Sequence, residues 1–160
     1  MSIFISIASY QDPLLASTIK SACMKASAEK DLVFGVCDQS SSPIDVSSIS
    51  KKAKIHYEHI DPILSKGPCW ARNRLQSFYQ GEDYFLQIDS HTQFDNDWDV
   101  ILMDQLKSLQ GLSSEPYFSK PIITAYPRSF EVISIKDEDC LLYTSPSPRD
   151  MRRSRMPSSA

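Results

Sequence analysis

The chain has 160 residues, of which 41% are hydrophobic and 23% are charged, and its formal net charge is −3. These values are typical of one soluble globular domain and exclude an intrinsically disordered chain. The acidic balance argues against nucleic acid as a partner, because phosphates call for a basic surface, and no apolar run approaches the roughly 20 residues that span a bilayer.

The first sixty residues predict strands that alternate with a helix. Ile3 to Ala8 is a continuous apolar run, which is typical of a central parallel strand buried on both faces. Asp12-Pro13 offers an N-cap and a first-turn proline, and apolar residues at helical spacing predict a helix that ends at about Glu29. Residues 32–37 and 54–60 are predicted as the second and third strands.

The next segment predicts two more helices with a strand between them. Gly67-Pro68 opens a helix that runs to about Tyr79, and residues 84–88 form an apolar, buried strand that ends just before Asp89. A third helix is predicted from about residue 97. Residues 121–125 and 130–135 are predicted as two further strands.

This alternation predicts an α/β fold with an open, mostly parallel sheet and helices on both faces. In such sheets ligands bind beyond the carboxyl ends of the strands. Those ends carry Ser9-Tyr10, Asp38-Gln39 and Asp89-Ser90-His91. The chain has neither G-x-G-x-x-G nor G-x-x-x-x-G-K-[ST], which excludes the dinucleotide fingerprint and the P-loop.

The most informative motif is the D-x-H of Asp89 and His91, which follows the fourth predicted strand. Residues i and i+2 of an extended segment project to the same side, so a carboxylate and an imidazole can meet one ion. A mixed oxygen and nitrogen pair suits Mn²⁺, which would neutralise charge on a departing nucleoside diphosphate. The structural alternative is that Asp89 caps a turn and His91 is a surface loop residue.

Three blocks together carry a family resemblance. They are ISIASYQDP at residues 5–13, KGPCWAR at residues 66–72, and FLQIDSH at residues 85–91 followed by Trp98. The combination resembles glycosyltransferase family 60, the polypeptide and hydroxyproline N-acetylglucosaminyltransferases, over residues 3–135. A similar helix and strand-D-S-H pattern occurs in the polypeptide N-acetylgalactosaminyltransferases, which are more distant relatives.

The resemblance implies a GT-A (Rossmann-like) fold and a retaining enzyme. It implies transfer of N-acetylglucosamine from UDP-GlcNAc to a protein hydroxyl (hydroxyproline or Ser/Thr), and so protein O-glycosylation, with Mn²⁺ or Mg²⁺ as cofactor. Asp89 and His91 match the family's metal-binding D-x-H. The residues expected to bind the donor are Ala8, Ser9, Tyr10, Arg72 and Ser90; the catalytic residues stay unknown.

Other polar side chains have structural interpretations of their own. Arg72 and Arg74 lie two apart on the predicted helix, so one is expected to face the strand ends and the other solvent. Four aspartates between residues 95 and 104 favour capping of a helix start over a second metal site. His56 and His59 are predicted surface residues, and Trp70 is predicted to pack half-buried rather than to stack on uracil.

The cysteines bear on the compartment. Cys23, Cys37, Cys69 and Cys140 show no C-x-x-C spacing, so neither a zinc knuckle nor a redox dithiol is indicated. Residues 3–7 lack the basic flank of a signal peptide. Reduced thiols indicate a cytoplasmic protein, or one of the Golgi lumen if an anchor precedes this sequence in a longer gene.

The composition changes at Cys140. Residues 140–160 have no period of 2 or 3.6 and are rich in Pro, Ser and Arg. Cys140 to Asp150 and Ser154 to Ala160 resemble the two ends of a translated sequencing adapter. We therefore expect residues 1–139 to be a truncated GT-A domain and residues 140–160 to pack against nothing. Because the acceptor side would then be missing, we expect this chain alone to be inactive.

Two other functions remain open at this point. One is a non-catalytic UDP-binding fragment with the same fold. The other is a nucleotidyltransferase, which uses a similar sheet and an acidic metal site. A nucleotidyltransferase would need a basic loop early in the chain to hold a triphosphate, and residues 9–13 contain no Lys or Arg. This favours a sugar nucleotide as ligand.

Overall fold

The computed structural model describes residues 1–110, 121–125, 130–132 and 141–143. The chain divides into two compact units, Met1–Pro121 and Ile122–Ala160. The second unit contains the antiparallel strands β5 (Phe130–Val132) and β6 (Leu141–Tyr143). The expectation that residues 140–160 pack against nothing therefore does not hold for the backbone of β6, which pairs with β5. The rest of that segment lies outside the described residues.

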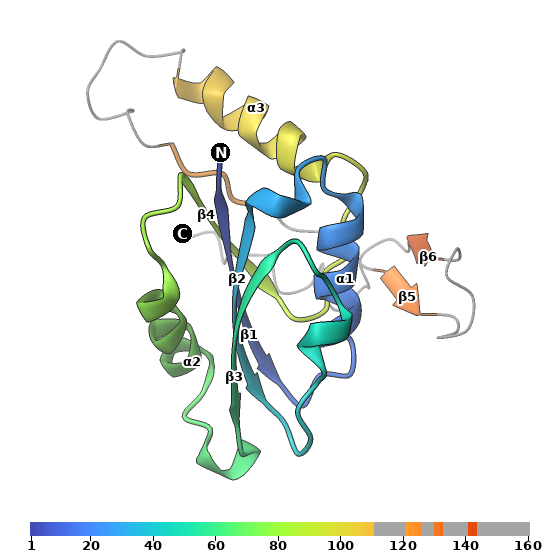
Figure 1. Ribbon diagram of the computed structural model, residues 1–160, viewed down its shortest axis with the longest axis vertical. Coiled ribbons are helices and arrows are strands. Elements are labelled where there is room, and N and C mark those ends of the chain that lie inside the picture. The colour runs from blue at the N-terminus through green and yellow to red at the C-terminus, as the bar shows by residue number, and fades with distance from the viewer. Residues whose placement is uncertain (111–120, 126–129, 133–140, 144–160) are drawn as a thin grey trace, which may run out of the picture. The chain divides into compact units, whose positions relative to one another are not determined.

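The first unit is built on a parallel sheet with the strand order β3-β2-β1-β4 (Figure 1). The strands are β1 (Ile3–Tyr10), β2 (Leu32–Gln39), β3 (Lys54–Ile60) and β4 (Tyr84–Asp89). All pairings in this sheet are parallel, so the predicted α/β class is confirmed. β1 is central and buried as predicted. β4 alternates between half-buried and exposed residues, so the prediction of a buried fourth strand is wrong.

Three α-helices accompany the sheet: α1 (Leu15–Lys25), α2 (Pro68–Leu75) and α3 (Trp98–Gln110). Short 3₁₀ turns lie at Glu29–Asp31, Val46–Ser48, Pro62–Leu64 and Gln76–Phe78. The predicted third helix is confirmed, and the predicted second helix ends in one of these turns. Residues 121–125 form no strand, so that prediction is wrong; residues 133–135 lie outside the described residues. None of the described helices has the length and apolar character needed to cross a membrane.

The two faces of the sheet have separate cores because side chains alternate along each strand. Ile5, Ile7 and Phe34 pack on the face that α1 covers, and Cys37 packs against Ala71 of α2 on the other. Figure 1 shows α1 and α2 on opposite sides of the sheet.

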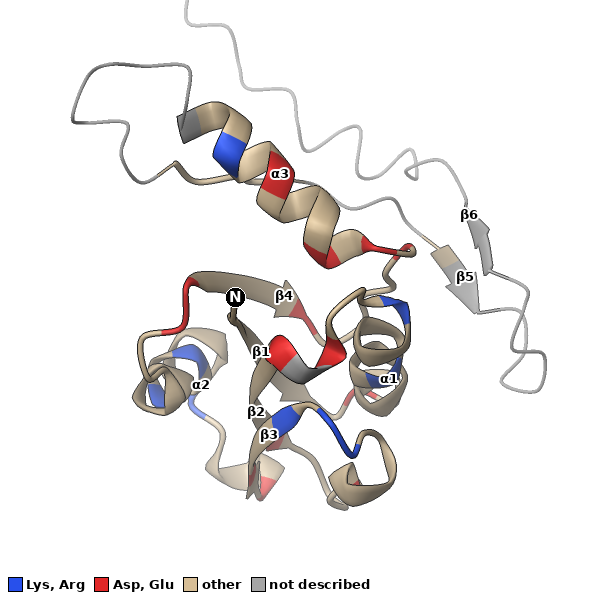
Figure 2. Cartoon of the chain, turned by 45° about the horizontal axis from the view of Figure 1, so that its top comes forward, with Lys and Arg blue, Asp and Glu red and all other residues tan. Residues whose placement is uncertain are grey.

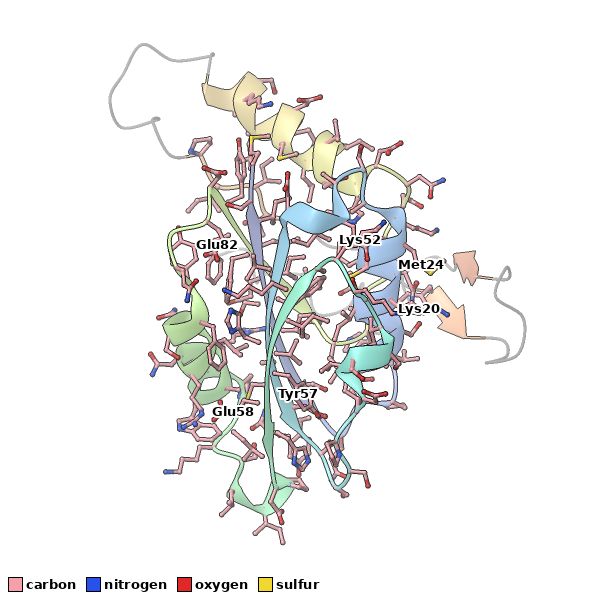
Figure 3. The ribbon with its side chains drawn as sticks, in the orientation of Figure 1. Lys20, Met24, Lys52, Tyr57, Glu58 and Glu82 are labelled. Atoms are coloured by element: carbon pink, nitrogen blue, oxygen red, sulfur yellow. The ribbon has the colours of Figure 1, made fainter. Side chains whose placement is uncertain are left out.

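Side chains of β3 show the same alternation in Figure 3, where Tyr57 and the next residue, Glu58, point to opposite faces. The Tyr57 hydroxyl donates to Asp38 Oδ2 at 2.6 Å and accepts from Ile44 N at 3.0 Å. Burial and the Asp38 carboxylate raise the pKa of Tyr57 to about 12, so this phenol stays protonated. Tyr57 therefore ties the loop after β2 back to the sheet.

Gly35 lies against the Phe4 ring. A Cβ at this position would lie 2.6 Å from Phe4 Cζ. Phe4 is itself fully buried and packs against the rings of Tyr79 and Phe85, with centroids 5.7 and 5.4 Å away. The neighbouring rings limit how far Phe4 can move, so an added methyl group is expected to cause overpacking.

We therefore expect Gly35→Ala to lower the free energy of unfolding by about 1–3 kcal/mol. Urea denaturation followed by circular dichroism measures this change. The double variant Gly35→Ala/Phe4→Leu should show positive coupling, because the smaller side chain makes room for the new methyl group. Strictly additive effects of the two substitutions would contradict the packing explanation.

Candidate functional site

A pocket of about 420 Å³ lies where β1 and β2 end and α2 begins. Its lining residues are Ala8, Ser9, Tyr10, Gln39, Ser65, Gly67 and Pro68. The structure thus brings together the three residues at the end of β1 that were expected to bind the donor, Ala8, Ser9 and Tyr10. It adds Gln39, which the sequence placed at the same edge without giving it a role, and residues of the loop before α2.

Gln39 holds the two sides of this pocket together. Its side chain is buried, its Nε2 donates to the Ser9 carbonyl at 3.0 Å, and its Oε1 accepts from Ser65 Oγ at 2.6 Å. The only sequence signal for this role was a polar residue at the end of an apolar strand. Gly67 has a φ of +91°, which favours glycine, and this lets the chain turn from Ser65 into α2.

Ser9 lines the pocket, but its side-chain hydroxyl is buried and is not exposed to it. The residue is 1% exposed, and its Oγ has no hydrogen-bond partner in the described part of the chain. A buried hydroxyl without a partner costs free energy.

Arg72 and Asp89 meet beside the pocket. Arg72 Nη2 lies 3.4 Å from Asp89 Oδ1, and Asp89 pairs in the sheet with Ala8, which lines the pocket. Figure 2 shows the acidic end of β4 and the basic residues of α2. The Asp89 side chain is 65% exposed, and such exposed ion pairs contribute little, so its carboxylate stays available to a cation.

The Arg74 side chain extends from α2 toward β3, away from Asp89. Its guanidinium makes two hydrogen bonds to the Glu58 carboxylate on β3. These bonds hold the pKa of Glu58 below its ordinary value. One of the two arginines was expected to face solvent, and Arg74 does so: its side chain is 42% exposed, although its guanidinium also pairs with Glu58.

His91 lies in a turn rather than in an extended segment. β4 ends at Asp89, and Thr92 Oγ1 donates to the Asp89 carbonyl at 2.9 Å. The argument that residues 89 and 91 share one side of a strand therefore does not hold. The His91 side chain is 60% exposed, and its Nδ1 lies 2.8 Å from Asp12 Oδ2. Ser90, which was expected to bind the donor, is buried and donates to the same oxygen at 2.6 Å.

Asp12 is the common partner of the D-x-H turn. Burial opposes its ionisation, but hydrogen bonds from Ser90, His91 and the Leu14 amide outweigh burial and lower the pKa of the carboxyl. The sequence predicted a helix N-cap at Asp12. The carboxylate instead accepts from the Leu14 amide, one residue before α1 begins, and holds the turn after β4.

Buried hydroxyls of α1 fix the segment that follows. Thr18 Oγ1 donates to the Ser90 carbonyl at 2.7 Å and accepts from the Thr92 amide at 3.1 Å. Ser21 Oγ accepts from the Phe94 amide at 3.1 Å. Polar residues on the inner face of a predicted helix were the available signal for this attachment.

Asp89 and His91 are the candidate ligands for the expected divalent cation, which would keep water and ligand oxygens in its coordination shell. No group of three His, Cys, Asp or Glu side chains able to hold a metal occurs in the described residues. The site therefore offers an exposed carboxylate and one free imidazole nitrogen. Ions such as Mg²⁺ are commonly held by one or two carboxylates plus substrate phosphates, and Mn²⁺ accepts similar oxygen ligands.

The remaining candidates have structural roles. Asp99 is buried and accepts from the Ser27 and Ala28 amides at 2.9 and 3.0 Å, so it caps the chain after α1 rather than its own helix. His56 is half-buried and stacks on Phe78 at 5.3 Å, so its prediction as a surface residue is wrong. His59 is exposed as predicted, and Trp70 packs half-buried as predicted.

Comparisons with known proteins address the fold and the family. The sequence matches a family profile described as glycosyltransferase (GlcNAc) over residues 2–54 and 41–142. No curated protein gives a significant match.

The similar solved structures include two of S. aureus TarS. A crystal structure of S. aureus TarS 1-349 has a TM-score of 0.50 at 17% identity, covering 68% of this chain and 32% of that chain. A second S. aureus TarS crystal structure has a TM-score of 0.49 at 16% identity, covering 67% and 20%. The chain thus spans about a third of the length of the first structure, and a likeness at this identity concerns the fold alone.

Proposed function

The chain belongs to the glycosyltransferase (GlcNAc) family, and we propose that it binds UDP-GlcNAc and provides the donor side of a GlcNAc transfer to a protein hydroxyl. The observation that carries this proposal is the pocket at the ends of β1 and β2, with the Asp89 carboxylate beside it. Ligands of open parallel sheets bind at this edge.

The uracil base would occupy the pocket. Uracil presents two carbonyl oxygens and one N–H along its edge, which the polar groups exposed on the pocket lining would have to meet. Gln39 stabilises the pocket because it fixes both the Ser9 backbone and the Ser65 hydroxyl.

The diphosphate would extend toward Arg72, Asp89 and His91. Arg72 supplies a guanidinium for a phosphate oxygen, while Asp89 and His91 would hold Mn²⁺ or Mg²⁺. The cation supplies Lewis-acid stabilisation of the departing UDP. Acidic Asp89 alone would repel a diphosphate, which is why the proposal includes a cation.

The finer assignments follow the resemblance to family 60. They are a retaining reaction and an acceptor hydroxyl on hydroxyproline, serine or threonine. Calorimetry with UDP, CDP, ADP and GDP in the presence of Mn²⁺ tests the donor, and UDP is expected to bind most tightly. Equal affinity for all four nucleotides would contradict the proposal that the pocket binds the uracil base.

Transfer from labelled UDP-GlcNAc to hydroxyproline, serine and threonine peptides tests the reaction. This chain alone is expected to bind UDP without transfer, so transfer to any of these peptides would show that it provides the acceptor side as well. Preference for a nucleoside triphosphate with release of pyrophosphate would favour a nucleotidyltransferase.

Ser9→Ala is expected to leave the affinity for UDP unchanged, because the Ser9 Oγ is buried and is not exposed to the pocket. The free energy of unfolding should not fall, because the hydroxyl has no partner in the described part of the chain. Calorimetry and urea denaturation measure the two quantities.

Ser6→Ala is the matched control. Ser6 also lies on β1, is 1% exposed, and has an unpartnered Oγ in the described part of the chain, but it does not line the pocket. UDP affinity should therefore be unchanged in this variant. A loss of UDP affinity in Ser9→Ala but not in Ser6→Ala would contradict this expectation and show that the Ser9 hydroxyl contacts the ligand.

A further inference from the structure

Asp12 makes a set of contacts that the proposed donor site does not by itself explain. Its Oδ1 accepts from the Leu14 amide at 2.9 Å, and its Oδ2 accepts from Ser90 Oγ at 2.6 Å and faces His91 Nδ1 at 2.8 Å. The Asp12 side chain is only 14% exposed. It thus bridges the loop after β1 and the turn after β4, which are about eighty residues apart in sequence.

This contact determines the tautomer of His91. An ionised carboxylate only accepts hydrogen bonds, so Nδ1 of the imidazole must carry the proton that it shares with Asp12. In the neutral ring, the lone pair is then on Nε2. The His91 side chain is 60% exposed, so this nitrogen belongs to an accessible ring. Histidines that bind metals almost always donate their other ring N–H to a carboxylate, a carbonyl or water.

We propose that Asp12 is a positioning residue that fixes the His91 ring so that Nε2 is free to bind the divalent cation; this inference rests on the proposed function. The Ser90 hydroxyl on the same carboxylate oxygen keeps Asp12 from rotating. The D-x-H turn would thus supply the protein ligands of the cation, Asp89 and His91. Asp12, which follows β1, would hold the His91 ring in place.

The substitution Asp12→Asn tests the tautomer with little change in shape. Because the Leu14 amide must be accepted at the Oδ1 position, the asparagine oxygen stays there and its NH₂ group takes the place of Oδ2. That group can donate one hydrogen to Ser90 Oγ and the other to His91 Nδ1. The imidazole proton would then move to Nε2, and the lone pair needed by a cation would be lost.

Asp61 provides a matched control. The sequence Asp61-Pro62-Ile63-Leu64 repeats the pattern of Asp12-Pro13-Leu14-Leu15, and Asp61 Oδ1 accepts from the Ile63 amide at 2.9 Å, as Asp12 does from Leu14. None of its hydrogen bonds in the described part of the chain involves a histidine. Asp61→Asn therefore removes one negative charge from a turn of the same kind, without changing a contact of His91.

Two measurements are made on the wild type and both variants. Nitrogen-15 NMR of the three histidine rings reports the tautomer of His91 without metal or nucleotide. Titration with Mn²⁺ in the presence of UDP, followed by electron paramagnetic resonance, gives the affinity for the cation. We expect Asp12→Asn to move the proton of His91 to Nε2 and to weaken Mn²⁺ binding by roughly 10- to 100-fold. Asp61→Asn should change neither quantity.

The outcomes separate this inference from the proposed function. If the wild type and Asp12→Asn bind Mn²⁺ equally well, the proposal that Asp12 positions His91 is wrong. The proposed donor site would not be affected by that result. If the wild type binds no Mn²⁺ with UDP, the proposed metal dependence fails and the role of Asp12 in it fails too. An Nε2–H tautomer in the wild type would overturn the inference whatever the affinities.

Discussion

Replacing both Asp89 and His91 with alanine is expected to abolish the effect of Mn²⁺ on UDP affinity, and each single replacement should weaken Mn²⁺-supported binding by at least about tenfold, or about 1.4 kcal/mol. The two side chains are the exposed carboxylate and imidazole of the D-x-H turn. Without them the cation has no protein ligand on this turn. Calorimetry of UDP in the presence of Mn²⁺ measures the loss.

When the same titration is made with a chelator instead of Mn²⁺, Asp89→Ala is expected not to weaken the binding of UDP. The Asp89 carboxylate repels a bare diphosphate and is paired with Arg72 at 3.4 Å, so Asp89→Ala removes repulsion and frees the guanidinium. Metal-free UDP affinity should then be unchanged or slightly higher. A purely structural role for Asp89 would lower affinity under both conditions, and that result would contradict a metal ligand.

Asp104→Ala is the control for charge. Asp104 lies on α3, its side chain is 67% exposed, and its carboxylate contacts Lys107 at 3.7 Å. Its removal changes the net charge by the same amount at an exposed position outside the pocket and the D-x-H turn. Equal effects of Asp104→Ala and Asp89→Ala would mean that general electrostatics, rather than coordination, governs the binding of UDP.

The parallel sheet could be predicted because apolar runs and helical periodicity are local signals. β1 and β3 lie at or close to their predicted positions, and Ala8, Ser9 and Tyr10 were placed at a ligand-binding edge that the pocket shares. The exposure of β4 could not be predicted in this way. Its residues are mostly apolar, yet burial depends on how many neighbours a strand has, which its own sequence does not record.

The contacts within the site were harder to predict than the fold. Asp12 and His91 are far apart in sequence, and only the pairing of β1 with β4 brings the loops after them together. Asp12 was assigned to the nearest helix because local signals offered no more distant partner. The same reasoning assigned Asp99 to its own helix, although it caps the chain after α1.

The largest stability loss is expected at Trp98, which joins α3 to the rest of the first unit. The side chain is 5% exposed, its ring centroid lies 4.5 Å from that of Phe94, and its Nε1 donates to the Ala22 carbonyl at 3.0 Å. Trp98→Ala should therefore lower the free energy of unfolding by about 3–5 kcal/mol. For a domain with a total stability of about 5–15 kcal/mol, this is a large fraction.

Trp70, the other tryptophan of the chain, is the matched control. It is half-buried, and the Arg74 guanidinium lies 5.1 Å from its ring, so truncation leaves space that solvent can fill. Trp70→Ala should cost clearly less than Trp98→Ala in urea denaturation. Trp98→Phe separates the two contributions at the buried site, because it keeps most of the apolar volume and removes only the N–H donor. If Trp98→Ala and Trp70→Ala were equally destabilising, α3 would not be anchored to the first unit mainly through Trp98.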